Sequence, residues 1–307
     1  MRPCLYPPRR GVLCGGDPGG VDGVGELGVD VRDEDGDQVV AGGEVAVNGV
    51  GGHAHLAGDR SQGDRVGAAR AHQLQRCALD FGGRLIGSRV VTEALQRGHR
   101  VTAFSRDASA IINQRENLSW ASVDVLDAAS IVAVLPGLDV LISGFQPGNA
   151  AKDFADTVQR SIADPTVYAA AAQALLKALE SHPRTRLIVI GGAGSLETEP
   201  GVVRADHEEL IHASLDELGL PRQYAAAVRG HREALDVLRT SNRLWTYFSP
   251  AEQITPGERT GRFRIGGDQP VLNADGLSRI SVEDAAVALV DEAELPRFVQ
   301  RRFTVGY

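Results

Sequence analysis

Residues 186–195 read RLIVIGGAGS, and this stretch decides the fold class. The run Arg186–Ile190 is apolar and partly β-branched, as in a strand that is buried on both faces, and small residues follow it at once. Elsewhere in the chain, similar apolar runs alternate with segments whose apolar residues recur at helical spacing. Such alternation predicts an α/β protein in which helices cover both faces of a doubly wound parallel sheet.

The expected elements follow from this alternation. Strands are predicted at residues 99–104, 118–124, 139–145, 186–190, 244–248, 262–265 and 302–305. Helices are predicted at residues 89–96, 106–112, 127–135, 167–179 and 221–238, with a last helix that starts at Ser281. Gly98 ends the first helix, Asp127 caps the third, and Asp284 is expected to complete a capping box with Ser281.

The first 80 residues have a different composition. All three cysteines, Cys4, Cys14 and Cys77, lie there, and residues 15–43 are rich in glycine without helical or strand periodicity. Glycine loses the most backbone entropy on folding, and few large apolar residues offset that loss here. We therefore predict a low-complexity extension over residues 1–80, disordered or mistranslated, with a natural flexible extension as the alternative. The folded domain is predicted over residues 81–307.

Composition and charge exclude several functional classes. The 307 residues are 43% hydrophobic and carry a net charge of −8, which argues against a disordered chain and against a dedicated nucleic-acid-binding protein. No apolar run reaches the roughly 18 residues of a membrane span, and no secretory signal is visible near Met1, so we expect a cytoplasmic protein. No metal site is expected, because the residues nearest to ligand spacing do not share one helical face. These residues are Asp206, His207, Glu208 and His212.

A glycine-containing segment precedes the first predicted helix. Gly82, Gly83 and Gly87 belong to GGRLIG at residues 82–87, before a helix that is expected to begin near Ser88. Glycines in that position let backbone N–H groups approach a dinucleotide diphosphate, which the helix dipole also favours. Arg84 stands where the middle glycine of such a loop is expected, so an ordinary turn is the alternative. A second glycine cluster at residues 45–52 has no convincing helix after it and is not expected to bind a ligand.

The carboxyl ends of three predicted strands carry further candidates, because open α/β sheets bind ligands at that edge. Ser105 and Arg106 follow the strand at residues 99–104, where an arginine suits the 2′-phosphate of NADP better than the 2′-hydroxyl of NAD. After two later strands, small residues would leave room for a nicotinamide ring and its ribose. These are Ser143, Gly144, Gly191, Gly192 and Ala193. A solvated arginine and plain turn chemistry are the alternatives.

Six segments carry a more specific resemblance. They are SRVVTEALQRGHRVTAFSRD (88–107), DVLD (124–127), RLIVIGGAGSLE (186–197), LWTYFSPAEQITPGERTGRFRIGGD (244–268), ISVEDAAVALVDEAE (280–294) and RRFTVGY (301–307). With them, the chain from about Gly87 to Tyr307 resembles the atypical short-chain dehydrogenase/reductase proteins, in particular the NAD(P)H-binding ones named NADH-flavin reductases. The resemblance implies a Rossmann-like, NAD(P)-binding domain and hydride transfer to a small planar acceptor such as a flavin or a quinone.

The same resemblance implies roles for single residues. Asp124 and Val125 would lie near the adenine of the cofactor. The substrate side would include Gly192 and Ala193 together with Ser249, Pro250 and Ala251.

The chain departs from the family at its first strand. Family members begin with a strand that is followed by G-A-T-G-x-x-G, whereas residues 73–85 here read QLQRCALDFGGRL. Either CALDF at residues 77–81 or VAVNGV at residues 45–50 fills the central position of the sheet. If neither does, the sheet has a gap and the cofactor loop is malformed.

The Tyr-x-x-x-Lys pair of the short-chain dehydrogenases is absent. Val228 stands four residues after Tyr224, and no lysine holds that position after any other tyrosine. Tyr224 is therefore the catalytic candidate and His231 a second proton donor, with helix packing and solvation as the alternatives.

We expect an NADPH-dependent reductase that transfers hydride to a flavin, quinone or similar small-molecule acceptor. It is expected to be a monomer or homodimer with no nucleic-acid or membrane partner. A non-catalytic NADP-binding redox sensor or scaffold, and an inactive chain, are the alternatives.

Overall fold

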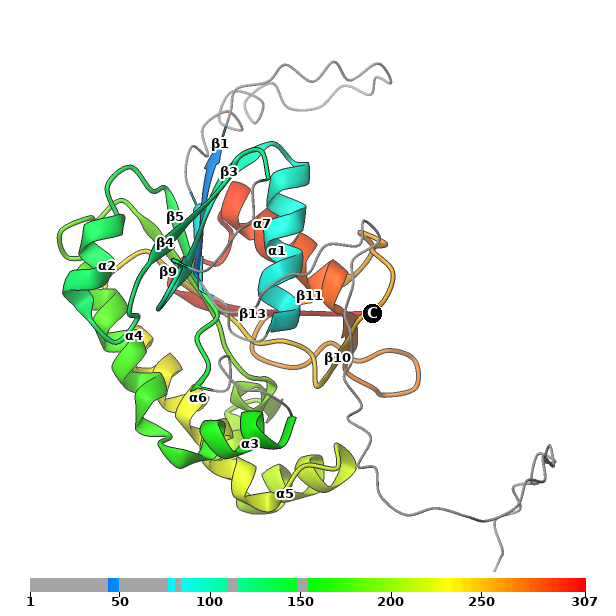
Figure 1. The fold of residues 1–307 in the computed structure, drawn as a ribbon. Coiled ribbons are helices and arrows are strands. Elements are labelled where there is room, and N and C mark those ends of the chain that lie inside the picture. Colours follow the sequence, from blue (N-terminus) through cyan, green and yellow to red (C-terminus); the bar gives the residue numbers. More distant parts are fainter. Residues whose placement is uncertain (1–43, 50–76, 81–83, 110–114, 148–153) are drawn as a thin grey trace, which may run out of the picture. The chain divides into compact units, whose positions relative to one another are not determined.

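A single sheet of nine strands runs through the part of the chain that the structure describes (Figure 1). The computed structural model describes residues 44–49, 77–80, 84–109, 115–147 and 154–307. In order across the sheet, the strands are β11 (Arg264–Gly266), β13 (Arg301–Gly306), β9 (Trp245–Phe248), β6 (Arg186–Ile190), β5 (Val140–Ser143), β2 (Cys77–Asp80), β1 (Glu44–Gly49), β3 (His99–Ser105) and β4 (Leu118–Ser122). β1 and β11 are antiparallel to their neighbours, and the remaining strands are parallel to one another.

The strand order changes direction between β2 and β5. From β2 the chain passes through α1 (Arg84–Gln96) to β3 and β4 on one side of the sheet, and then continues with β5, β6, β9 and β13 on the other side. This is the doubly wound arrangement of the Rossmann fold, in which the crevice at the change of direction binds ligands. The predicted α/β fold class is confirmed.

Both candidate segments for the centre of the sheet form strands. β2 contains CALD and pairs in parallel with β5, so a strand does run toward Gly82. β1 contains VAVNG and lies between β2 and β3, antiparallel to both. The segments at residues 45–50 and 77–81, which were predicted as alternatives, therefore both contribute a strand to the centre of the sheet. A domain boundary at residue 80 stays a prediction, because residues 1–43 and 50–76 lie outside the described residues.

Helices cover both faces of the sheet (Figure 1). On one face, α1 and α7 (Val282–Glu294) share a core with apolar side chains of β3, β5, β6, β9 and β13. On the other face, α2 (Ala128–Val134), α4 (Thr166–Ala178) and α6 (Ala225–Arg239) pack on the opposite side chains of the strands. Removing this apolar surface from water is the main favourable term that holds the layers together.

Short elements follow the carboxyl ends of β5, β6 and β9. α3 (Phe154–Ala163) and α5 (Glu208–Glu217) both contact the start of α6 and lie on the same side of the molecule in Figure 1. Two-stranded sheets are formed by β7 (Glu197–Glu199) with β8 (Val202–Val203), and by β10 (Gln253–Thr255) with β12 (Arg279–Ser281). Single 3₁₀ turns occur at η2 (Ala193–Ser195), η3 (Arg204–Asp206) and η4 (Arg222–Tyr224).

Two predicted helix positions are wrong. α1 begins at Arg84 rather than near Ser88, so Gly87 is buried inside the helix instead of preceding it. Residues 106–109 do not begin a helix, because the Asp107 carboxylate accepts hydrogen bonds from Ser109 N (2.9 Å) and Ser109 Oγ in a local turn. The rest of that predicted helix, residues 110–112, lies outside the described residues. α3 was not predicted.

The segment PGERTG at residues 256–261 is fastened to the start of α7. The buried Asp284 carboxylate accepts hydrogen bonds from Thr260 Oγ1, from Gly261 N at 2.8 Å and from Tyr307 Oη at 3.0 Å. Ser281 caps α7 as predicted, because its Oγ accepts a hydrogen bond from Asp284 N at 3.0 Å. The predicted capping box is wrong, since Ser281 N donates to Tyr307 Oη and the Asp284 carboxylate turns toward the segment.

Glu93 on α1 also holds the segment at residues 256–261. Its carboxylate is 3% exposed and accepts hydrogen bonds from Arg259 Nε at 2.6 Å, Arg259 Nη2 at 2.7 Å and Arg97 Nε at 2.7 Å. Burial by itself would raise the pKa of Glu93, but the two guanidinium groups hold that pKa below its usual value. The specific PGERTG motif is therefore explained by structural contacts between α1, α7 and the terminal strand.

Replacing Asp284 by alanine tests this fastening. Asp284→Ala removes a fully buried carboxylate that accepts three hydrogen bonds, so we expect the free energy of unfolding to fall by about 2–4 kcal/mol. Urea unfolding followed by far-UV circular dichroism measures it. Asp291→Ala on the same helix is the matched control, because Asp291 is 39% exposed in its ion pair with Arg97 and should cost less than about 1 kcal/mol. Equal losses in both variants would contradict the role of Asp284.

Candidate functional site

Several of the predicted residues meet at the carboxyl edge of the sheet. Parallel pairing sets Asp80 at the end of β2 opposite Ser143 at the end of β5, and Ser143 opposite Val189 of β6. Ser143 and Gly144 therefore lie beside the start of the loop that follows β6, which contains Gly191. This edge coincides with the change of direction between β2 and β5, where a Rossmann sheet binds its ligand.

The glycine segment before α1 is only partly described. Gly82 and Gly83 lie outside the described residues, so their expected contact with a diphosphate stays a prediction. Gly87 belongs to the first turn of α1 and is buried. It therefore contributes to the packing of the helix start rather than to a loop before it.

The end of β3 presents an exposed arginine. The Arg106 side chain makes no ion pair with any residue that the structure describes, and it is exposed. The neighbouring Asp107 carboxylate accepts two hydrogen bonds from Ser109 rather than pairing with Arg106. These hydrogen bonds lower the pKa of the Asp107 carboxyl group. Ser105 is buried, and its Oγ accepts a hydrogen bond from Asp107 N at 3.3 Å. A contact of Arg106 with the 2′-phosphate of NADP stays a prediction.

The loop after β4 forms a local turn. Asp124 Oδ1 accepts a hydrogen bond from Leu126 N at 3.0 Å, and Asp124 N donates a hydrogen bond to Ser130 Oγ at 3.0 Å. Asp124 itself is exposed, whereas Val125 is 5% exposed. The contact of these two residues with an adenine stays a prediction, and the local hydrogen bonds already account for the aspartate.

The small residues after β6 are required by packing. A Cβ atom on Gly191 would lie 1.9 Å from the Tyr247 ring, and one on Gly194 would lie 2.3 Å from Val228 Cγ1. A Cβ atom on Gly192 would meet His231 Cδ2 at 3.3 Å. The loop thus lies directly against β9 and α6, and the His231 ring borders the space beside Gly192 that was expected to be open.

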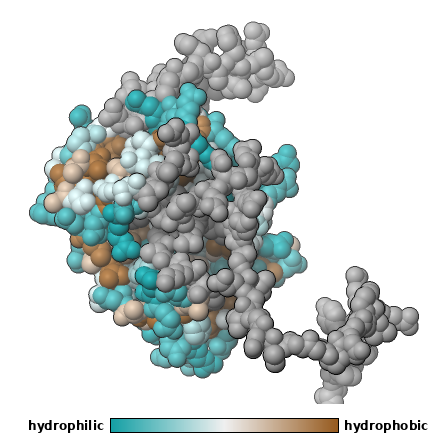
Figure 2. Space-filling view, in the orientation of Figure 1, coloured by the Kyte–Doolittle hydropathy of each residue, from teal (hydrophilic) through white to brown (hydrophobic). Residues whose placement is uncertain are grey.

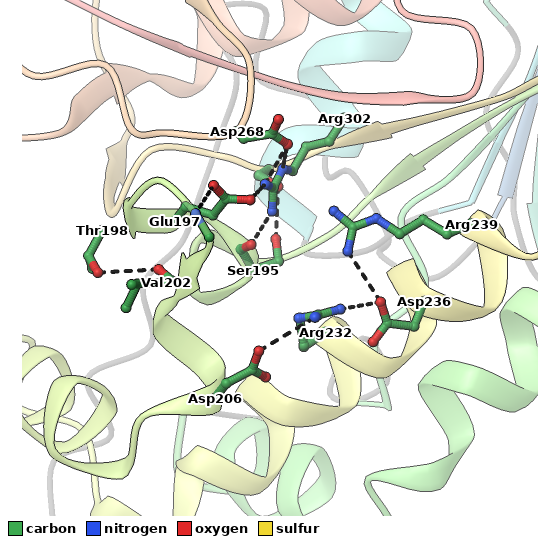
Figure 3. A network of polar contacts seen from close by, with 12 residues as sticks. Ser195, Glu197, Thr198, Val202, Asp206, Arg232, Asp236, Arg239, Asp268 and Arg302 are labelled. Atoms are coloured by element: carbon green, nitrogen blue, oxygen red, sulfur yellow. Dashed lines mark hydrogen bonds and ion pairs between the residues drawn. The ribbon is translucent and has the colours of Figure 1, made fainter.

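A buried arginine on β13 holds this loop in place (Figure 3). Arg302 donates hydrogen bonds to the Ser195 carbonyl oxygen and to Asp268 Oδ1, and its Nη2 lies 3.3 Å from Glu197 Oε1. Its side chain is 1% exposed, and two carboxylates balance its charge. In the same view, Arg232 on α6 pairs with Asp206 and Asp236, which ties α6 to the turn η3.

Ser249, Pro250 and Ala251 are buried at the end of β9. Ser195 Oγ donates to the Gly192 carbonyl oxygen at 2.7 Å and lies 2.8 Å from Ser249 Oγ, so the Ser249 hydroxyl donates to Ser195. The Ser249 hydroxyl is thereby used inside the protein. A substrate contact at these three residues stays a prediction.

Tyr224 and His231 lie near a tyrosine that the sequence analysis did not single out. The ring centroids of Tyr168 on α4 and His231 on α6 are 4.3 Å apart. Tyr224, at the start of α6, packs against the same apolar cluster as Tyr168. His231 is 8% exposed, so the alternative that it is a solvated helix residue is wrong. Burial lowers the pKa of His231 to about 4 and raises the pKa of Tyr224, so both side chains are neutral near pH 7.

Tyr168 carries no local signal that could have revealed it. It lies within the alanine-rich run of α4, and its neighbours Phe145 and His231 come from other elements. Together with Ser143, these side chains line a cavity of about 20 Å³ at the ends of β5 and β6.

The described residues show neither a membrane-spanning helix nor a metal cluster. None of the helices in the described ranges has the length and hydropathy needed to cross a bilayer. No three His, Cys, Asp or Glu side chains in those ranges are arranged to hold a metal ion. Two of the four residues that the sequence analysis considered for a metal site are near each other on α5, where His212 Nε2 lies 3.7 Å from Glu208 Oε1.

Comparisons with known proteins agree with this geometry. The family model described as NAD(P)H-binding matches residues 82–293. YwnB of Bacillus subtilis (strain 168), which is uncharacterised, is 31% identical over 223 residues, or 71% of this chain and 92% of that protein.

Two solved structures are similar to this chain over most of their length. A crystal structure from Burkholderia pseudomallei, of a protein provisionally named as exported, is 38% identical with a TM-score of 0.59, and the match covers 73% of this chain and 95% of that one. A protein of Streptococcus pneumoniae TIGR4, provisionally named an NADH-flavin reductase, is 27% identical with a TM-score of 0.57, and the match covers 72% of this chain and 94% of that one.

The burial of His231 predicts a pH dependence of stability. Its folded-state pKa of about 4 lies below the unfolded value of about 6.5, so below pH 6.5 the unfolded chain binds the extra proton. The contribution of neutral, buried His231 to the free energy of unfolding is therefore fully present above pH 6.5 and is lost as the pH falls toward 4. Between pH 7 and pH 5, wild type should lose about 2 kcal/mol more than His231→Gln in urea unfolding. His207→Gln, which changes an exposed histidine, is the control and should follow wild type. Identical pH profiles for wild type and His231→Gln would contradict the burial of a neutral imidazole.

Proposed function

The chain belongs to the NAD(P)H-binding family of Rossmann-fold oxidoreductases, and on that premise we propose that it is an NADPH-dependent reductase which passes hydride to a small planar acceptor such as a flavin or a quinone. One observation carries the cofactor part of this proposal. Arg106 is exposed, without an ion-pair partner in the described ranges, at the end of β3, while the adjacent Asp107 is occupied by Ser109.

The residues at the carboxyl edge fit a dinucleotide. Arg106 would receive the 2′-phosphate, for which its planar guanidinium offers paired donors. The start of α1 would face the diphosphate with its free backbone N–H groups. Ser143, Gly144 and Gly192 would line the place of the nicotinamide at the change of direction of the sheet. Reduced nicotinamide supplies the hydride when the cofactor is bound.

The protein's own part in the reaction is placement rather than acid catalysis. The Tyr-x-x-x-Lys pair is absent, and burial lowers the pKa of His231 to about 4, so its imidazole carries no acidic proton near neutral pH. Burial also raises the pKa of Tyr224, which makes its phenol a weaker acid. A two-electron transfer to a flavin or quinone needs orientation and exclusion of water more than a strong protein acid. The provisional name of the Streptococcus pneumoniae relative supports this class of acceptor.

A second function is favoured by one observation. The cavity beside Tyr168 measures about 20 Å³, far below the roughly 300 Å³ at which pockets begin to hold a drug-sized ligand. A protein that binds NADPH without transferring hydride, as a redox sensor or scaffold, would need no additional cavity for an acceptor.

The preference for NADPH rests on Arg106. Arg106→Ala should weaken NADPH binding by about tenfold or more and leave NADH binding within about twofold, because the lost contact is a charge-assisted hydrogen bond to a group that NADH lacks. Titration of cofactor fluorescence measures both affinities. Arg262→Ala removes another exposed arginine from a loop and serves as the control. Equal losses for NADPH and NADH would show that Arg106 does not read the 2′-phosphate.

Turnover separates the reductase from the sensor. With NADPH in excess, addition of FMN or 1,4-naphthoquinone should cause enzyme-dependent loss of absorbance from reduced nicotinamide, at a rate proportional to the amount of protein. Binding of NADPH without oxidation by either acceptor would reject the reductase and favour the sensor. Failure to bind NADPH would reject both.

A further inference from the structure

Three hydroxyl groups gather between α3, α4 and η4. Ser161 on α3 is fully buried, and its Oγ donates to the Thr157 carbonyl oxygen at 2.8 Å. It lies near enough to the phenols of Tyr168 and Tyr224 to lower the pKa of each, against the larger opposite effect of burial. None of the cofactor contacts described above uses these hydroxyls.

The Tyr168 hydroxyl is the unusual member of this group. Tyr168 is 3% exposed, and its Oη makes no hydrogen bond of normal geometry with any described residue, although Ser161 is close to it. Burying an unsatisfied hydroxyl destabilises a protein, and nearly all buried polar groups avoid that cost. Such an exception calls for an explanation, and a partner that arrives from outside the protein would provide one.

Packing fixes the Tyr168 ring where it is. A Cβ atom on Gly230 of α6 would lie 2.5 Å from Tyr168 Cδ2 and 2.7 Å from the Pro165 carbonyl oxygen, so glycine is needed for the two helices to approach this closely. His231 contacts the ring of Tyr168 from α6, and Phe145 meets it edge to face with centroids 6.5 Å apart. The hydroxyl therefore cannot turn away to find another partner without moving the helices.

The adjoining cavity has room for a single polar atom. Ser143, Phe145, Tyr168 and His231 line its volume of about 20 Å³, close to the space that one water oxygen needs. It lies at the ends of β5 and β6, where the nicotinamide is proposed to bind. Among these four residues, Phe145 is only partly buried, whereas Ser143, Tyr168 and His231 are buried.

We propose that Tyr168 donates a hydrogen bond from its buried hydroxyl to a ring carbonyl oxygen of the acceptor, with Phe145 and His231 against the edge of the acceptor ring. This inference rests on the proposed reductase function and names the residue that recognises the acceptor. The ligand class is a planar compound with a ring carbonyl, which flavins and quinones share. Burial raises the pKa of Tyr168, so the phenol keeps its proton and acts as a donor only. The hydride brings two electrons to the acceptor, and the oxygen that becomes negative takes its proton from water.

Tyr168→Phe in the full chain tests the proposal, with Tyr307→Phe as the matched control. Tyr307 Oη is already bonded to Asp284, away from the cavity. Binding of 1,4-naphthoquinone and of FMN is measured separately, by quenching of tryptophan fluorescence, and thermal unfolding is measured on the same samples. The two ligands show which ring carbonyl compound is recognised.

We expect Tyr168→Phe to bind at least one of the two ligands about fivefold more weakly, through a higher KM with little change in kcat. Its Tm should equal that of wild type or exceed it by about 2 °C, because the unsatisfied hydroxyl is gone. Tyr307→Phe should show the reverse, with a lower Tm and acceptor affinity within about twofold of wild type.

Two outcomes would overturn the inference. If wild type reduces an acceptor and Tyr168→Phe binds it within about twofold of wild type, the proposed function stands and the role of Tyr168 falls. A lower Tm of Tyr168→Phe with unchanged acceptor affinity would also reject the role of Tyr168 in acceptor binding. It would indicate that a structural water fills the cavity. If wild type binds NADPH but neither acceptor, the proposed function and the inference fail together.

Discussion

Parallel pairing of β2 with β5 is the constraint on which the candidate site depends. This pairing sets Asp80 opposite Ser143 and so brings the end of the strand before α1 next to Gly144. β5 pairs in turn with β6, which places Gly191 at the same edge. A shift of one residue in any of these strands would turn its side chains to the opposite face of the sheet. Strand register at the centre of the sheet therefore fixes which residues can face a ligand.

Features with strong local signals could be predicted from the sequence. β6 has the predicted bounds, α4 is displaced by one residue from residues 167–179, and the Asp127 cap is present because its carboxylate accepts from Ala129 N at 2.9 Å. The start of α1 was misplaced because the glycines at residues 82–87 outweighed the helix propensity of the residues between them. Arg106 could be placed at a strand end by counting along the chain. Tyr168 could not be found, because its significance comes only from contacts with other elements.

The glycines after β6 show why a small residue is an ambiguous signal. The sequence predicted that Gly191 and Gly192 leave room for a ring of the cofactor. In the structure, the Tyr247 ring occupies the space beside Gly191, and the His231 ring borders Gly192. A glycine reports that something approaches the backbone closely, but the sequence does not say whether that neighbour is a ligand or a side chain. The loop after β6 can pack against side chains and also contact a ligand, since packing on β9 and α6 fixes the backbone that a ligand would meet.

Arg302 has a consequence for the biogenesis of the protein. It clamps the carbonyl of Ser195, which precedes it by 107 residues, and balances the carboxylates of Glu197 and Asp268. While the ribosome is still adding residues to the nascent chain, the strands from β3 to β6 are already available to associate. The loop after β6 gains its cation only when β13 has been synthesised. The order of translation therefore delays the fixing of this loop until the chain has been synthesised through β13.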